Sequence, residues 1–182
     1  MRIIAGLYRG RPLIAPKGDT TRPTADRTRE ALFSMLTSRL GSFDELRVLD
    51  LFAGSGALGL EALSRGAAGC TFVEQDNAAL DSLRTNIAKL GASGAEIRAQ
   101  SVMALGPAPA HYDLILIDPP YESGAGVVAL ERLLRLGWIA PGAIASVETT
   151  KKEIVTVEGF TTDVERVHGK AKLTLLRTDA DL

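Results

Sequence analysis

The sequence is poor in cysteine, with Cys70 as the only one among 182 residues. One cysteine cannot form an intrachain disulfide, which fits a reducing compartment. Cys70 begins the apolar run 70–73, which favours a buried and unreactive thiol over a nucleophile. The sequence also lacks an apolar segment after Met1 and any apolar run long enough to span a bilayer. We therefore expect a cytoplasmic protein without a membrane partner.

Net charge is also low, a formal −1 at pH 7, so the molecule as a whole indicates no charged partner. The charge is unevenly distributed, however. Residues 1–40 carry eight basic side chains against three acidic ones, a net +5, which leaves −6 for the remainder. This asymmetry favours a basic extension that binds an anionic partner, although a solvated basic face would give the same pattern. We expect two units, a basic extension at 1–40 that would bind such a partner and an acidic domain at 41–182.

The sequence does contain a glycine turn directly after an apolar run, VLDLFAGSGALG at 48–59. The apolar run predicts a buried strand, and the residues from Ala57 onward predict a helix. Gly54 and Gly56 allow a sharp turn that a ligand can approach closely. This strand, turn and helix are typical of a nucleotide-binding βαβ unit.

Strand and helix patterns alternate along the rest of the chain. The strands are predicted at 46–52, 70–73, 95–99, 113–117, 142–148, 161–167 and 172–177. Helices are predicted at 57–65, 76–91 and 127–136, and a hairpin at 1–20 and a helix ending near Gly41 precede them. This order predicts an α/β fold with a Rossmann-like, doubly wound, seven-stranded, mostly parallel sheet. The last two strands form a C-terminal antiparallel hairpin, and a small hairpin and helix extend the N-terminus.

Two acidic residues indicate which cofactor the turn holds. Glu74 follows Gly54 by 20 residues, at the end of the second strand, where a carboxylate accepts hydrogen bonds from ribose hydroxyls. The glycines and Glu74 alone would suit NAD. Asp50 would repel a pyrophosphate, however, and the chain has no second substrate domain. S-adenosyl-L-methionine has a ribose, an ammonium and no phosphate, so we expect Asp50 near its amino-acid end, unless backbone amides of the turn bind this carboxylate.

The fourth strand ends in Asp118-Pro119-Pro120-Tyr121. This segment lies at the sheet edge where the glycine turn is expected, and ligands bind at that edge in open α/β sheets. An oxygen of Asp118 and a nearby main-chain carbonyl can hold both hydrogens of an exocyclic amine, with the nitrogen lone pair aimed at a methyl donor. The proton leaves to Asp118 or to water. Tyr121 is expected to stack on a target base that is extruded or unpaired.

These motifs resemble those of class I S-adenosyl-L-methionine-dependent methyltransferases that act on an exocyclic amine. Further segments resemble the bacterial small-subunit rRNA guanine-N2 methyltransferases of the RsmD type, namely RIIAG at 2–6, RGR at 9–11, RPTADRTRE at 22–30 and LGLEALSR at 58–65. The resemblance implies methylation of guanine 966 of 16S rRNA on N2, within an assembly intermediate of the 30S subunit. A monomer without a bound metal is expected.

The resemblance and the strand positions together give the candidate site residues. Catalytic candidates are Asp118, Pro119, Pro120 and Tyr121. Cofactor-binding candidates are Asp50, Phe52, Ala53, Gly54, Ser55, Gly56, Glu74, Gln75, Ser101, Val102 and Asp118. RNA-binding candidates are Arg2, Arg9, Arg11, Lys17, Arg22, Arg27 and Arg29, and Lys170 and Lys172 in the last hairpin are expected to add contacts.

Two other functions are compatible with parts of the pattern. DNA adenine-N6 methyltransferases use a similar Asp/Asn-Pro-Pro-aromatic motif, but they usually carry a target-recognition region for which this chain has no room. A non-catalytic RNA-binding factor in ribosome assembly would explain the basic extension. The presence of both Asp118 and Tyr121 argues against that second alternative.

Overall fold

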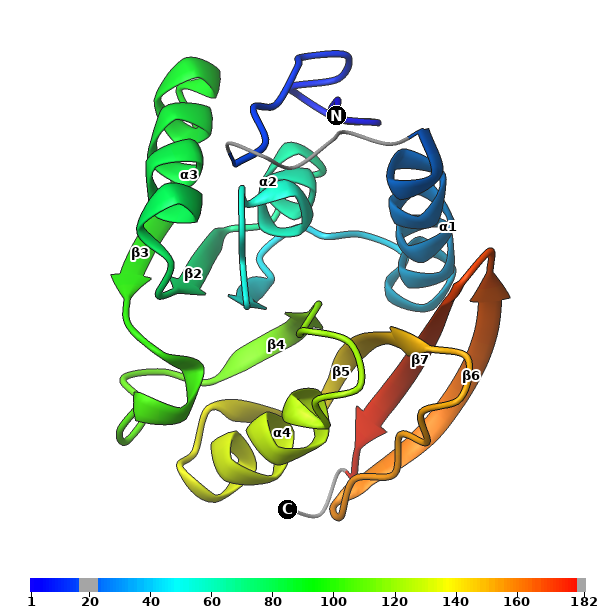
Figure 1. The fold of residues 1–182 in the computed structure, drawn as a ribbon. Coiled ribbons are helices and arrows are strands. Elements are labelled where there is room, and N and C mark those ends of the chain that lie inside the picture. The colour runs from blue at the N-terminus through cyan, green and yellow to red at the C-terminus, as the bar shows by residue number, and fades with distance from the viewer. Residues whose placement is uncertain (17–22, 180–182) are drawn as a thin grey trace.

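The computed structural model describes residues 1–16 and 23–179, in which seven strands form one sheet. The sheet order is β3-β2-β1-β4-β5-β7-β6 (Figure 1). The strands are β1 (Arg47–Leu51), β2 (Gly69–Glu74), β3 (Ala95–Ala99), β4 (Tyr112–Ile117), β5 (Ile139–Thr150), β6 (Phe160–His168) and β7 (Ala171–Thr178). The first five strands are parallel, and β7 pairs antiparallel with both β5 and β6. The predicted fold class is confirmed.

Helices cover both faces of the sheet, as Figure 1 shows. They are α1 (Pro23–Leu40), α2 (Ala57–Ser64), α3 (Asn77–Leu90), the short 3₁₀ helix η1 (Val102–Ala104) and α4 (Ala125–Arg135). Leu114 and Leu116 of β4 belong to the hydrophobic core under α1, α2 and α3. Ile115 and Ile117 alternate with them and belong to the core under α4. Because both faces are covered, β4 is apolar from Leu114 to Ile117.

Local sequence signals explain most element boundaries. Asp76 caps α3 by accepting a hydrogen bond from the amide of Ala79 at 2.9 Å, and Gly91 ends the helix in a left-handed conformation. Strand β5 begins earlier than the predicted 142–148. Its pairing with β4 shifts register, because Tyr112 pairs with Ile139 while Leu114 pairs with Ile144. The apolar pattern in the sequence therefore predicted only the part of β5 that pairs regularly with β4, which follows this irregularity.

The N-terminal segment forms a tight antiparallel turn in which Arg2 and Pro12 make a β-bridge. Ile3 and Leu13 are buried in the same core as the apolar face of α1, which includes Phe33 and Leu36. Residues of the 1–40 and 41–182 stretches therefore share one hydrophobic core. That the two stretches differ in function stays a prediction. Among the described residues, no helix is both long and apolar enough to cross a membrane.

Candidate active site

Four residues meet at the carboxyl edge of the sheet because their strands are in register. Leu51 of β1 pairs with Val73 of β2 and with Ile117 of β4, and Ile117 pairs with Val147 of β5. The next residue of each strand therefore lies at this edge, and these residues are Phe52, Glu74, Asp118 and Glu148. The glycine turn and the Asp-Pro-Pro-Tyr loop are adjacent, as the sequence predicted.

The glycine turn contains three residues in the left-handed backbone region, which favours glycine. Phe52 has φ 58°, Gly54 φ 57° and Gly56 φ 86°, all in the left-handed region. A Cβ on Gly56 would lie 2.4 Å from Cδ1 of Leu83, so α3 packs directly against the turn. The amide of Ala53 donates to the carbonyl of Val73 at 3.1 Å, which joins the turn to β2. The turn is therefore held in place by its neighbours.

The carboxylate of Glu74 is fixed beside this turn. Its Oε1 atom accepts a hydrogen bond from the amide of Gly54 at 2.8 Å, and its Oε2 atom accepts from the amides of Gln75 and Asp76. A small surface hollow lies there, lined by Phe52, Val73, Glu74, Gln75, Gln100 and Val102. Four of these residues were predicted from the sequence. An aromatic ring, an aliphatic side chain and a carboxylate are what a nucleoside with free ribose hydroxyls requires, so the residues present fit this group.

Two lining residues were missed and one predicted residue has another role. Gln100 immediately precedes the predicted Ser101, and its position after β3 at the same sheet edge is a signal that could have found it. Val73 was assigned only to the strand. Ser101 does not line the hollow, and its hydroxyl instead accepts a hydrogen bond from the amide of Met103 and caps η1.

Asp50 lies beneath the turn and is 1% exposed. Its Oδ2 atom accepts a hydrogen bond from the amide of Gly59 at 2.9 Å. Burial raises the pKa of Asp50 well above its ordinary value; the Gly59 hydrogen bond opposes this effect, and the charges of Asp118 and Glu74 add to it. Direct contact between Asp50 and a ligand, as expected from the sequence, does not fit this geometry. The alternative fits, in which Asp50 is bound by a backbone amide near the turn.

The Asp-Pro-Pro-Tyr loop places an acid and an aromatic ring at the surface. Tyr121 is 49% exposed, and its hydroxyl donates to Oε2 of Glu148 at 2.9 Å. Asp118 is exposed to solvent as a residue, while its carboxyl group lies among the strand ends. Burial there, the charge of Glu148 and a hydrogen bond with Glu148 raise the pKa of Asp118 to about 8. Burial and the same Glu148 carboxylate also raise the pKa of the Tyr121 phenol.

Glu148 was not among the predicted site residues. The sequence did place it at the end of the fifth strand, where the edge argument used for Glu74 and Asp118 applies equally.

Among the described residues, no three His, Cys, Asp or Glu side chains are grouped in a way that could hold a metal ion. The residues at the site present backbone amides, carboxylates and aromatic rings.

The predicted RNA-binding residues fall into three groups. Arg2, Arg9, Arg11 and Arg27 are exposed, and Arg11 also donates to the carbonyl of Lys89 at 2.6 Å. Lys17 and Arg22 lie outside the described residues. The prediction that Arg29 binds RNA is wrong, for the reason given next.

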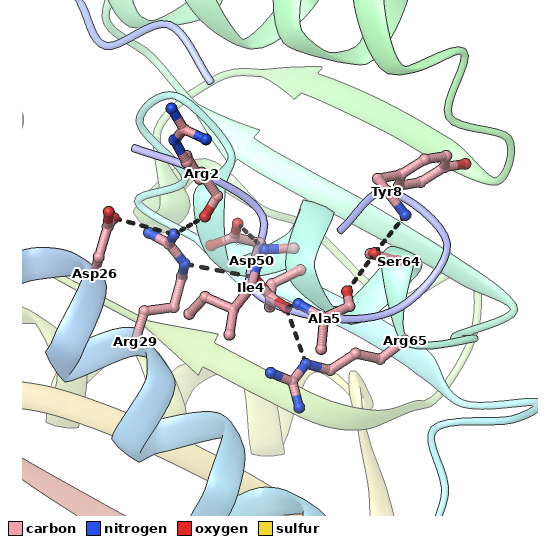
Figure 2. Close-up of polar contacts among 11 residues, drawn as sticks. Arg2, Ile4, Ala5, Tyr8, Asp26, Arg29, Asp50, Ser64 and Arg65 are labelled. Carbon is pink, nitrogen blue, oxygen red and sulfur yellow. Dashed lines mark hydrogen bonds and ion pairs between the residues drawn. The ribbon is translucent and has the colours of Figure 1, made fainter. Parts of the chain in front are cut away.

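The Arg29 side chain is 4% exposed and points into the protein (Figure 2). It donates to the backbone carbonyl of Arg2 and pairs with Asp26 at 3.2 Å and with Glu61 at 3.7 Å. A guanidinium held in this way cannot reach a phosphate, so Arg29 stabilises the N-terminal segment instead. The prediction that Lys172 adds RNA contacts is also wrong, because this side chain is buried and donates to the carbonyl of Glu153. Lys170 is exposed.

Comparisons with known proteins agree with this geometry. The family model described as conserved hypothetical protein 95 matches residues 1–177. Ribosomal RNA small subunit methyltransferase D of Haemophilus influenzae is 38% identical over 175 residues, 93% of this chain and 89% of that protein. The Escherichia coli K12 protein of the same name is 41% identical over 152 residues, 82% of this chain and 74% of that protein.

A solved structure extends the similarity to three dimensions. The Escherichia coli protein yhhF superposes with a TM-score of 0.87 at 37% sequence identity, and the match covers 99% of this chain and 98% of that one. Fold, site and sequence thus lead to the same assignment. The chain belongs to the conserved hypothetical protein 95 family, which is the family of the RsmD-type methyltransferases.

Proposed function

We propose that this protein transfers a methyl group from S-adenosyl-L-methionine to N2 of guanine 966 in 16S rRNA, within an assembly intermediate of the 30S subunit. The observation that carries the proposal is the adjacency of Asp118-Pro119-Pro120-Tyr121 and the Glu74 hollow at one sheet edge. The two relatives named ribosomal RNA small subunit methyltransferase D support an rRNA substrate.

The Glu74 hollow is the proposed site for the adenosine part of the cofactor. Glu74 would accept hydrogen bonds from the ribose hydroxyls, while Phe52 and Val102 would pack against the adenine. Gly54, where a Cβ would meet nothing within 4 Å, leaves room for the methionine part above the turn. When bound, S-adenosyl-L-methionine supplies an electrophilic methyl group on a sulfonium.

The Asp-Pro-Pro-Tyr loop would hold the target amine. The guanine N2 is a poor nucleophile because its lone pair is delocalised into the ring. A carboxylate oxygen of Asp118 and the carbonyl of Pro119 would accept its two hydrogens, which aims the lone pair at the methyl carbon. The N2–carbon bond forms as the carbon–sulfur bond breaks, and the extra N2 proton leaves to Asp118 or to water. The exposed ring of Tyr121 would stack on the extruded guanine.

The basic extension at 1–40 would bind the RNA backbone. Arg2, Arg9, Arg11 and Arg27 are exposed in a stretch of net charge +5, and such side chains bind phosphates without reading sequence. Lys17 and Arg22 belong to the same proposal, although they lie outside the described residues. A monomer acting in the cytoplasm, where ribosomal subunits are assembled, completes it.

The test uses purified protein, labelled S-adenosyl-L-methionine and small subunits isolated from cells that lack this activity. We expect one N2-methylguanosine per subunit, located by mass spectrometry of the rRNA, and loss of at least 100-fold in rate for Asp118→Ala. Label on duplex DNA but not on subunits would favour an adenine methyltransferase. Tight binding of subunits without any transfer would favour a non-catalytic assembly factor.

A further inference from the structure

The site contains a third group, Glu148, that the proposed chemistry does not use. Glu148 follows Val147, the β5 partner of Ile117, so its backbone lies beside that of Asp118 at the carboxyl edge. Its Oε2 atom accepts the Tyr121 hydroxyl at 2.9 Å. The loop that would hold the target base is therefore tied to β5 through this carboxylate.

Asp118 and Glu148 form a pair of carboxylates without a matching cation. Among the ion pairs of the described residues, none involves either group. Two like charges side by side cost stability unless a ligand or a proton compensates them. Burial raises the pKa of Asp118, and the charge of Glu148 and a hydrogen bond with Glu148 add to this effect, so the pair without a ligand favours holding a proton. A ligand that brings several N–H donors would take the place of that proton.

We infer that Glu148 selects guanine by accepting the N1–H of the target base, beside the N2 amine held at Asp118. This inference rests on the proposed function. An ionised carboxylate accepts hydrogen bonds only, with room for about four, and Tyr121 occupies one position on Glu148. The edge of guanine presents N1–H next to the N2 amine, an unbroken row of donors. Adenine presents an acceptor at its ring N1, next to its amine, which a carboxylate repels.

The hydrogen bond from Tyr121 to Glu148 orients the carboxylate for the proposed contact with guanine N1–H. The hydroxyl holds Glu148 from one side while the exposed Tyr121 ring is available to stack on the base. Stacking fixes the plane of the base, and Asp118 fixes its amine. The adjacent ring N1 would then face the neighbouring strand β5, which carries Glu148.

The test compares guanine with 2-aminopurine at the target position, in small subunits assembled from rRNA that carries a synthetic segment. 2-Aminopurine keeps the reacting amine but has an acceptor at N1. We expect wild type to methylate guanine about 100-fold faster than 2-aminopurine, and Glu148→Gln to reduce this ratio by about 10-fold or more, because the amide can donate to N1. Glu158→Gln, at an exposed carboxylate in the loop before β6, should leave both rates unchanged.

Two results would overturn the inference. If Glu148 only positions Tyr121, Glu148→Gln lowers both rates by the same factor and the ratio stays constant. The second result comes from wild type alone, by equilibrium binding of the same RNA with inosine, which keeps N1–H and lacks the amine. We expect inosine to retain binding within about 3-fold and 2-aminopurine to lose about 10-fold; the reverse order rules out an N1–H acceptor. Wild type that forms no N2-methylguanosine overturns the proposed function itself, and this inference with it.

Discussion

Oε1 of Glu61, in α2, accepts a hydrogen bond from the backbone amide of Ile4 at 2.8 Å, across 57 residues of sequence. Oε2 accepts from the amide of Ala5 at 3.1 Å and from Arg65 at 2.9 Å, while Arg29 lies 3.7 Å from Oε1. The Glu61 side chain is completely buried. One carboxylate thus joins the N-terminal segment, α1 and α2.

Glu61→Ala should lower the free energy of unfolding by about 3–5 kcal/mol, because it leaves two backbone amides and the Arg65 guanidinium without their acceptor and removes the buried partner charge of Arg29. Urea denaturation followed by circular dichroism measures the loss. Glu158→Ala, at an exposed carboxylate, should change stability by less than about 0.5 kcal/mol. A similar small effect for Glu61→Ala would mean that the N-terminal segment is held by its apolar contacts alone.

Two glycines of the N-terminal turn offer a matched pair of substitutions. Gly6 and Gly10 have φ 89° and 80°, so alanine is strained by about 1–2 kcal/mol at either position. A Cβ on Gly6 would lie 2.0 Å from the carbonyl oxygen of Ser64, whereas a Cβ on Gly10 would meet nothing within 4 Å. Gly6→Ala should therefore cost about 1–3 kcal/mol more than Gly10→Ala in urea denaturation. Equal costs would show that the turn can move away from α2 freely.

Much of the fold follows from local sequence signals, whereas the partners of buried charges do not. Alternating apolar patterns and the Asp76 cap predicted the sheet and its helices, because those signals act within a few residues. Arg29 shares the composition of the basic stretch, yet it is buried against Glu61, and sequence alone does not show a contact across 32 positions. Asp50 is a similar case, since its amide partner Gly59 lies on the next element.

The part of the site that could be predicted from the sequence is the part that follows from one rule, that the carboxyl ends of parallel strands meet at one edge of the sheet. That rule brought Glu74 and Asp118 together, and it applies to Glu148 as well. Nothing in the sequence marks Glu148 apart from its position, because a single acid after a strand is common. Its importance comes from the hydrogen bond with Tyr121, which depends on how the Asp-Pro-Pro-Tyr loop folds back toward β5.

Charge reversal at two exposed arginines tests the role of the basic extension. Arg9→Glu with Arg11→Glu should weaken binding of small-subunit RNA and reduce the dependence of affinity on salt by about one unit of slope per lost phosphate contact. Affinity for S-adenosyl-L-methionine, measured by calorimetry, should stay unchanged. Arg135→Glu, at the exposed end of α4 on the other face of the sheet, is the matched control. Equal loss of RNA and cofactor binding would contradict a separate RNA role.

The raised pKa of Asp118 also predicts how stability depends on pH. The native group binds its proton up to about pH 8, whereas the unfolded group releases it near 3.8. Between these values the native state holds more protons than the unfolded state, so the free energy of unfolding falls as pH rises through this window. Urea midpoints should decrease from about pH 4 to about pH 8, with a shallower slope in Asp118→Asn. Identical slopes in both proteins would contradict the raised pKa.

Methyl transfer should depend on the same proton in the opposite direction. Asp118 accepts the hydrogens of the target amine only when it is ionised, so kcat/KM should rise with pH and level off above about 8, the pKa of this group in the free enzyme. In Glu148→Gln the neighbouring negative charge is gone, and the pKa of Asp118 should fall. The inflection of the residual activity should then move to lower pH. Stopped assays with labelled S-adenosyl-L-methionine across the pH range measure both profiles. An inflection that persists unchanged in Asp118→Asn would assign the titration to another group.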